Sequence, residues 1–240
     1  MVVPGEAAED ERARWLELFP QGFEERETPG GLELAGYAER VPPELAGAAV
    51  DAVEPGWEHS WRAFHTGARI GRLWVGPPWE AAPAGALAVV IDPGRAFGTG
   101  AHATTRLCLE LLLERPPGSL LDVGCGSGVL SIAAAKLGFG PVVAIDHDPQ
   151  AVEATLANAA ANGVEVDARL VDATVDPLPP SEVAVANVAL EPVEAVAPRL
   201  DASTLLSSGY LSRDDPRLPG WRRAERRVAG EWAADRFERE

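Results

Sequence analysis

Short apolar runs alternate with longer amphipathic stretches through the second half of the chain. The runs have β-type composition and lie at residues 120–122, 142–145, 166–171, 183–186 and 204–207. The stretches between them suit helices and lie at residues 131–137, 149–162 and 190–199. Two further runs, at residues 222–228 and 231–239, predict a closing hairpin around Ala229-Gly230. Because strands that alternate with helices are typical of parallel sheets, we expect an α/β fold with a doubly wound, mostly parallel sheet of seven strands.

The first 55 residues have a different pattern and predict a separate, small α+β domain. Two short helices are expected at residues 10–19 and 42–53. A hairpin around Pro29-Gly30-Gly31 is expected from residues 22–28 and 32–39. We place the domain boundary at Pro55-Gly56, which leaves residues 56–240 as the larger domain.

Three more elements are expected between the two regions. Residues 70–75 predict one strand, and residues 89–91 predict another. A helix is expected at residues 106–114, with Thr104 or Thr105 as its N-cap. The loop between the second strand and this helix is dense in glycine and polar residues, which is typical of loops that serve a site.

A glycine-rich turn follows the first run of the sheet. Asp122 and Val123 lead into Gly124, Gly126 and Gly128, and helical sequence follows directly. A strand that enters a helix through glycines presents bare backbone N–H groups and the positive end of a helix dipole to a ligand. Asp146 ends the next strand, where an acidic side chain holds the ribose hydroxyls of a nucleoside. We therefore expect an adenosine-type cofactor across these two strand ends.

The spacing of the glycines separates two classes of cofactor. Dinucleotide dehydrogenases have the pattern G-x-G-x-x-G, whereas Gly128 comes one position early and Val129 holds the dehydrogenase position. The form G-x-G-x-G, preceded by Asp122, resembles the S-adenosylmethionine-dependent methyltransferases.

Further polar residues end other strands of the predicted sheet. Asp172 follows the third strand and Asn187 follows the fourth, so both are expected at the same carboxyl edge as Gly124 and Asp146. Asp172 suits a contact with the rim of the adenine. Asn187 is our candidate for the catalytic group that accepts a hydrogen bond from an attacking amine, and its alternative role is a turn cap after a strand.

A second motif is more specific than the glycines. The loop reads Asp92-Pro93-Gly94, then Ala96-Phe97-Gly98-Thr99-Gly100, then His102 and Thr104-Thr105. This segment resembles the signature of the PrmA family, whose members methylate protein eleven of the large ribosomal subunit. Other family features follow in the same order, from Asp146-His147-Asp148-Pro149 through Asn158 and Asn162-Gly163 to Ala186-Asn187. The similarity covers residues 57–211, while the N-terminal domain is short for the family.

The resemblance implies roles for individual residues. Thr105, the glycine turn with Gly124, Gly126 and Gly128, Asp146 and Asn187 would contact S-adenosylmethionine. Thr105 would bind the methionine end and Asp146 the ribose, and Phe97 would lie near the sulfonium, since an aromatic face favours positive charge. His102 would either order the loop or act catalytically by relaying the departing proton.

The distribution of charged residues along the sequence indicates what kind of molecule the protein binds. The formal net charge is −16, and residues 1–60 contain 14 Asp or Glu and 4 Arg, a net charge of −10. Such a surface either keeps the protein in solution or receives a basic macromolecule, and it repels phosphates. We therefore expect a basic protein substrate, such as a ribosomal protein, and no direct contact with nucleic acid.

Other sequence features argue against several classes of protein. No apolar run is long enough to span a bilayer, and the acidic start of the chain lacks the regions of a secretion signal, so we expect a cytoplasmic monomer without membrane contact. Cys108 and Cys125 are too few for a disulfide scaffold or a zinc site, and no metal is expected. Cys125 suits a small filler of the glycine turn rather than a nucleophile.

The sequence thus predicts an S-adenosylmethionine-dependent methyltransferase acting on lysine and/or N-terminal amines of a ribosomal protein. The same chemistry on another protein or a small amine is one alternative. A non-catalytic adenosyl-binding module is another, and the intact Asn187 and loop motif argue against it. A nicotinamide dehydrogenase is disfavoured by the position of Gly128.

Overall fold

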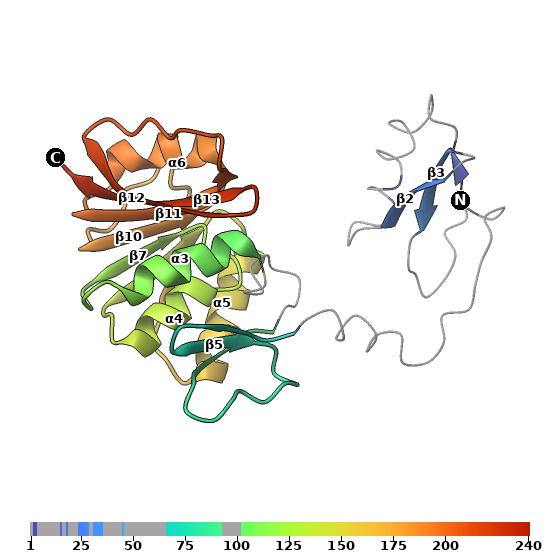
Figure 1. Cartoon of the computed structure of the whole chain (residues 1–240), viewed down its shortest axis with the longest axis horizontal. Helices are drawn as coiled ribbons and strands as arrows, with labels where there is room; N and C mark the ends of the chain where they lie inside the picture. Colours follow the sequence, from blue (N-terminus) through green and yellow to red (C-terminus); the bar gives the residue numbers. More distant parts are fainter. Residues whose placement is uncertain are drawn as a thin grey trace. The chain divides into compact units, whose positions relative to one another are not determined.

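The chain divides into two compact units, residues 1–58 and 59–240 (Figure 1). The computed structural model describes residues 66–92 and 102–240 of the larger unit. In the smaller unit it describes Val2–Val3, Trp15, Leu18, Glu24–Thr28, Gly31–Ala35 and Leu45. Trp15 and Leu18 are helical and Leu45 lies in a 3-10 turn, but the other residues of the helices predicted at 10–19 and 42–53 lie outside the described residues, as do residues 93–101.

The smaller unit contains the predicted hairpin. Strand β2 (Glu24–Thr28) pairs antiparallel with β3 (Gly31–Ala35), and β3 also pairs with β1 (Val2–Val3). The register places Glu24 opposite Ala35 and Thr28 opposite Gly31, which confirms the expected pairing, and residues 36–39 of the predicted second strand lie outside the described residues. The side chains of Trp15, Leu34 and Leu45 are buried.

A small sheet precedes the large one in the chain. It has the order β4-β5-β6, formed by β4 (Ala68–Ile70), β5 (Leu73–Gly76) and β6 (Leu87–Val90). The prediction of one strand at residues 70–75 is wrong, because the chain reverses at Gly71, whose φ of +56° is the left-handed conformation that glycine adopts readily. Strand β6 runs parallel to β5, and Val90 is the last residue of this sheet.

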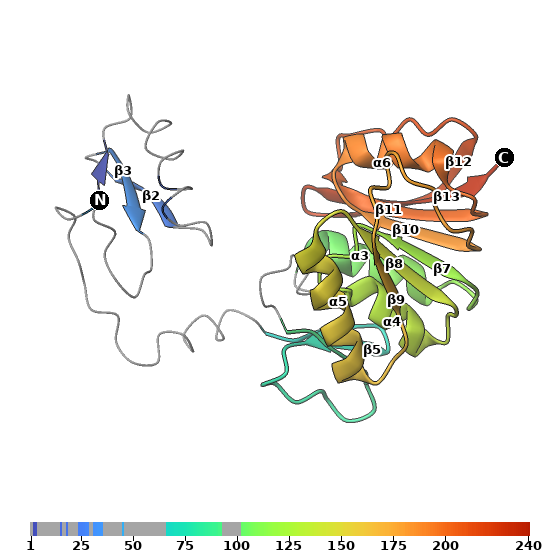
Figure 2. The same ribbon diagram turned by 180° about the vertical axis from the view of Figure 1, so that it is seen from behind.

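The predicted seven-stranded sheet is confirmed (Figures 1 and 2). Its order is β12-β13-β11-β10-β7-β8-β9. The strands are β7 (Leu120–Val123), β8 (Val142–Asp146), β9 (Asp167–Leu170), β10 (Val183–Asn187), β11 (Thr204–Leu211), β12 (Trp221–Ala229) and β13 (Trp232–Arg239). Pairing is parallel from β11 to β9, and β13 runs antiparallel to both of its neighbours. The carboxyl ends of β10, β7 and β8 therefore meet at one edge.

Helices cover both faces of this sheet. One core contains residues of α3 (Ala103–Leu113), α4 (Val129–Leu137) and α5 (Pro149–Asn162), and the other contains residues of α6 (Leu190–Val196). Neighbouring residues of one strand belong to different cores, as Leu120 and Leu121 do, because successive side chains of a strand point to opposite faces. Strands buried on both sides explain the continuous apolar runs of the sequence.

Helix α3 and the helix predicted at residues 190–199 differ from the prediction at one end by three residues each. Helix α3 begins at Ala103, and its N-cap is His102 rather than Thr104 or Thr105, because the His102 ring accepts a hydrogen bond from the Thr104 N–H. The stretch predicted as one helix at residues 190–199 is α-helical only to Val196 and ends in a 3-10 turn, Ala197–Arg199. Pro198 lacks the N–H that the α-helix would need at this point.

Strand β11 has a bulge beside the end of β10. The register of β11 on β13 shifts between Ser208 and Tyr210, and the residue between them, Gly209, has a φ of +101°. A Cβ at Gly209 would collide with the backbone carbonyl of Val188. The missing side chain therefore allows the backbone after β10 to lie against β11.

We expect Gly209→Ala to destabilise the protein by about 3 kcal/mol, because it combines backbone strain with a collision against a main-chain atom. Gly230→Ala is the matched control, since Gly230 also has a positive φ of +60° but no neighbouring atom lies within 4 Å of an added Cβ. The control is expected to lose only about 1 kcal/mol. Urea unfolding measures both, and equal losses would refute the close contact with Val188.

Candidate functional site

A cavity of about 220 Å³ opens at the carboxyl ends of β7, β8 and β10. Ligands of doubly wound sheets bind at this edge, where the strand order reverses. The cavity is lined by Thr105, Gly124, Cys125, Gly126, Val129, Leu130, Asp146, His147, Asn187 and Val188. Five residues predicted for the site thus share one cavity, namely Thr105, Gly124, Gly126, Asp146 and Asn187.

The glycine turn follows β7 and lies against the end of β8. Gly124, Gly126 and Gly128 all have positive φ values, of +73°, +54° and +80°. The N–H groups of Gly124 and Cys125 both donate to the Ile145 carbonyl, at 2.8 and 3.1 Å. A Cβ on Gly124 would collide with the Val188 side chain. The turn therefore requires glycine both for its backbone conformation and for its close packing.

The Asp146 carboxylate is oriented by two backbone donors. Its Oδ2 accepts from the Gly126 N–H at 3.0 Å, and its Oδ1 accepts from the Asp148 N–H at 3.0 Å. The His147 ring nitrogen Nδ1 lies 3.5 Å from Oδ1. Each carboxylate oxygen can accept more than one hydrogen bond, so Asp146 retains acceptor capacity towards the cavity that it lines.

Asn187 and Thr105 meet across the cavity from separate parts of the chain. Asn187 ends β10, Thr105 lies in the first turn of α3, and the Asn187 amide nitrogen lies 3.3 Å from the Thr105 hydroxyl as its donor. Because the nitrogen end of the amide points to Thr105, the oxygen end points away from it. The amide oxygen is the acceptor that this pair can offer to a ligand.

Three other predicted site residues, His102, Gly128 and Asp172, do not line the cavity. The His102 ring caps α3, lies 2.8 Å from the Thr104 hydroxyl and packs edge-on against Trp232. Gly128 is the N-cap of α4. Asp172 is exposed, and hydrogen bonds from the Thr174 hydroxyl and N–H lower the pKa of its carboxyl group. Phe97 lies outside the described residues.

Comparison with known proteins identifies the family of this chain. The PrmA family model, described as "Ribosomal protein L11 methyltransferase (PrmA)", matches residues 40–213. The chain belongs to the PrmA family. Its members are methyltransferases, so the chain is an enzyme that transfers methyl groups.

Individual PrmA relatives agree with this assignment. The ribosomal protein L11 methyltransferase of Symbiobacterium thermophilum is 41% identical over 85% of this chain and 76% of its own length. The corresponding protein of Myxococcus xanthus is 38% identical over 77% of this chain and 72% of its own length. A crystal structure of ribosomal protein L11 methylase from Lactobacillus delbrueckii subsp. bulgaricus has a TM-score of 0.66, with 29% identity over 73% of this chain and 99% of that chain.

Sequence reasoning did not assign Val129, Leu130, His147 or Val188 to the site of this PrmA protein. Three of them are apolar and one is a histidine between two acidic residues, and none of these features is a local sequence signal for a ligand site. Cys125 also lines the cavity, but burial raises the pKa of its thiol to about 12, which removes the thiolate that a nucleophile requires.

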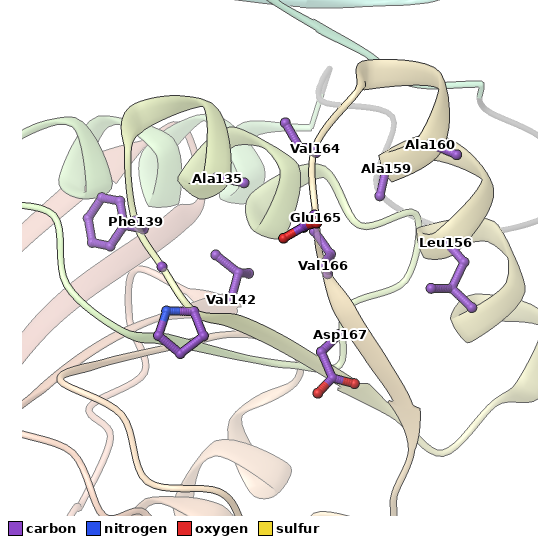
Figure 3. Close-up of a pocket in the computed structure, with 12 residues that line it drawn as sticks. Ala135, Phe139, Val142, Leu156, Ala159, Ala160, Val164, Glu165, Val166 and Asp167 are labelled. Carbon is purple, nitrogen blue, oxygen red and sulfur yellow. The ribbon is translucent and has the colours of Figure 1, made fainter.

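A larger hollow lies away from these residues (Figure 3). It measures about 680 Å³ and lies where β8 and β9 begin, near the ends of α4 and α5. Its walls are mainly apolar, with Phe139, Val142, Leu156 and Val166 among the labelled side chains, while Glu165 and Asp167 are acidic. Because the hollow contains none of the family's glycine-turn or strand-end residues, we assign the site to the smaller cavity.

Among the described residues, no cluster of His, Cys, Asp or Glu could hold a metal ion. In the same part of the chain, no helix has the length and apolar character needed to cross a membrane.

Asp122 is a buried carboxylate at the entrance to the glycine turn. Its Oδ2 accepts from the Ser131 hydroxyl at 2.6 Å and from the Ser131 N–H at 3.1 Å. Its Oδ1 has no hydrogen-bond partner among the described residues. Burial raises the pKa of Asp122 from 3.8 to about 6, the Ser131 hydrogen bonds oppose this rise, and the Asp146 charge adds to it.

The raised pKa predicts how stability changes with pH. Between the two pKa values the folded protein holds a proton that the unfolded chain has lost, so the stability contributed by Asp122 falls as the pH rises through about 6. Relative to wild type, Asp122→Asn should therefore gain on the order of 2–3 kcal/mol of unfolding free energy between about pH 4 and pH 7.

Urea unfolding at several pH values measures this difference. Asp167→Asn is the control, because the exposed Asp167 has its pKa lowered by a hydrogen bond from Arg169 and should give a small change of the opposite sign. A difference between Asp122→Asn and wild type that does not vary with pH would contradict the assignment.

Proposed function

We propose that this PrmA protein transfers methyl groups from S-adenosylmethionine to lysine and/or N-terminal amines of ribosomal protein L11. The observation that carries the proposal is the cavity that brings together Thr105, the glycine turn, Asp146 and Asn187. The names of the relatives support L11 as the substrate.

The residues around the cavity fit an adenosyl cofactor. Bare backbone at Gly124 and Gly126 lets a ligand approach the turn, and Asp146 offers acceptors for ribose hydroxyls. Cavities that enclose a drug-sized ligand measure about 300–1,000 Å³. The present cavity is smaller, so part of the cofactor would lie outside it, and Asp172 and Gly128 are proposed to border that part.

Charge also favours this cofactor. S-adenosylmethionine carries a positive sulfonium and supplies a methyl group that is already activated for transfer. The buried Asp122 carboxylate has an oxygen without a described partner, and Asp146 adds a second negative charge nearby. Opposite charge stabilises a cationic ligand most strongly where water is excluded. Phe97 is proposed to lie beside the sulfonium, on the basis of its place in the sequence motif.

Asn187 is the proposed catalytic residue. A lysine amine has an ordinary pKa of about 10.4 and must lose a proton before it can attack. The Asn187 amide oxygen, with its nitrogen directed to Thr105, would accept a hydrogen bond from the neutral amine and orient its lone pair towards the methyl group. His102 is engaged in capping α3, which favours its ordering role over proton relay.

The acidic N-terminal unit is proposed to recognise the substrate. Residues 1–60 have a net charge of −10, and a negative surface attracts a basic protein by long-range electrostatics. The same surface repels nucleic acid phosphates, so the proposed substrate is the free ribosomal protein. A ribosomal substrate also implies that the enzyme acts in the cytoplasm, and we propose that it acts as a monomer.

The direct test uses purified L11, labelled S-adenosylmethionine and the full chain. We expect label in L11 at amine nitrogens, and a rising KM for L11 as added salt screens the charges. A ribosomal protein extract serves as the comparison. Label in a different protein of the extract, with none in L11, would refute the substrate assignment.

Two substitutions separate binding from chemistry. Asn187→Ala is expected to keep cofactor affinity within about threefold while lowering kcat at least about 100-fold, because it removes an interaction with the reacting amine. Asp146→Ala is expected to weaken cofactor binding by at least about tenfold, because it removes a charged hydrogen-bond partner. Calorimetry gives the affinities and the labelling assay gives kcat. Unimpaired turnover by Asn187→Ala would show that another group orients the amine.

A further inference from the structure

Helix α5 has three polar side chains on the face that it turns towards the glycine turn and β6. They are Thr155, Asn158 and Asn162, which share one face because their spacing of three and four residues matches the helical repeat. Asn158 and Asn162 belong to the family pattern, and the proposed chemistry gives neither of them a role. Their contacts show that they hold different parts of the chain.

Asn158 joins two segments that border the site. Its amide nitrogen donates to the Ser127 carbonyl of the glycine turn at 2.9 Å. Its amide oxygen accepts from the N–H of Asp92 at 3.1 Å. Asp92 is the residue at which the PrmA loop motif begins, directly after the small sheet. One buried amide therefore connects the glycine turn to the start of that motif.

Thr155 supports the same turn one helical turn earlier. Its hydroxyl lies 3.1 Å from the Gly126 carbonyl and 3.2 Å from the Cys125 sulfur as a donor. Its side chain also packs against Gly128, where an added Cβ would lie 2.9 Å from it. Thr155 and Asn158 together satisfy two successive carbonyls of the glycine turn, at Gly126 and Ser127.

Asn162 makes similar hydrogen bonds away from the turn. Its amide oxygen accepts from the Val90 N–H at 2.9 Å, and its amide nitrogen donates to the Val90 carbonyl at 2.6 Å. A side-chain amide thus takes the place of a neighbouring strand beside β6. Its amide nitrogen also donates to the Asn158 carbonyl at 2.8 Å. These hydrogen bonds go to Val90 and to α5 itself rather than to the glycine turn, so Asn162 resembles Asn158 in chemistry and differs from it in location.

We propose that Asn158, assisted by Thr155, is a positioning residue that sets the glycine turn in the conformation that binds S-adenosylmethionine. The inference rests on the proposed function. Binding groups must be held within about 0.5 Å of their productive geometry by neighbouring hydrogen bonds. At Gly124 and Gly126 the turn has no side chain, so contacts to its backbone contribute to holding it in place. One of the two carbonyls that accept hydrogen bonds from α5 belongs to Gly126, which lines the cavity. The other belongs to Ser127, the next residue of the turn.

The test compares Asn158→Ala with Asn162→Ala in the full chain. Both variants remove a side-chain amide that binds the main chain near β6, so both should lower the melting temperature. We expect the Kd for S-adenosylmethionine to rise about tenfold in Asn158→Ala, because the turn loses a hydrogen bond that holds its binding geometry. It should stay within about twofold of wild type in Asn162→Ala. Calorimetry with S-adenosylmethionine measures Kd, and calorimetric melting measures stability.

A second pair of variants covers the case in which Asn158→Ala does not fold. Thr155→Val keeps the shape of the side chain and removes its hydroxyl. The Kd for S-adenosylmethionine should therefore rise several-fold, which is the change that corresponds to a loss of about 1 kcal/mol of binding free energy. Thr155→Ser restores the hydroxyl and should recover most of the affinity. A Kd unchanged by Thr155→Val would overturn the inference.

The outcomes distinguish this inference from the proposed function. Normal binding by wild type, with equal changes of Kd in Asn158→Ala and Asn162→Ala, would overturn the positioning role alone. Failure of the wild-type chain to bind S-adenosylmethionine would overturn the proposed function, and the positioning role with it. A selective loss of affinity in Asn158→Ala, at a melting temperature similar to that of Asn162→Ala, would support the inference.

Discussion

Val188 packs between two glycines, and this contact determines the spacing of the site. A Cβ on Gly124 would collide with the Val188 side chain, and a Cβ on Gly209 would collide with its carbonyl. Strand β10 pairs with both β7 and β11, so the residue after β10 contacts the segment after β7 through its side chain and β11 through its main chain. Asn187 directly precedes Val188. The close approach therefore holds the Asn187 amide beside the glycine turn, which is where the proposed methyl transfer would use it.

The glycine turn itself is held by hydrogen bonds from elements on both sides. Ser131 at the start of α4 binds the Asp122 carboxylate before the turn, and α5 engages the carbonyls of Gly126 and Ser127. Buried backbone groups need partners, and a glycine-rich segment has no side chains to supply them. The helices therefore help to hold the turn, while the absence of side chains at Gly124 and Gly126 leaves room for a ligand to approach it.

Negative charge links stability to function in this methyltransferase. Burial raises the pKa of the Asp122 carboxyl group, because ionisation within the protein is unfavourable. Its charge therefore lowers stability at neutral pH. Under the proposed function, the same charge would favour a cationic cofactor, so a group that lowers stability would serve binding. Negative charge in the acidic N-terminal sequence would likewise attract the substrate, which is proposed to be basic.

Local patterns in the amino-acid sequence predict most elements of the larger unit and the strand ends that carry the candidate site residues. Hydrophobic periodicity and capping residues are local, so the bounds of α5 and the ends of β7, β8 and β10 follow from residues only a few positions apart. The hydrophobic pattern alone did not predict the hairpin of β4 and β5, although Gly71 is a local sequence signal for its turn. The tertiary structure determines which polar groups contact one another. Asn187 contacts Thr105, which is 82 residues away in the chain, and Asn158 contacts Asp92, which is 66 residues away. Such partners depend on how helices pack on the sheet, and no local period of the sequence encodes that packing.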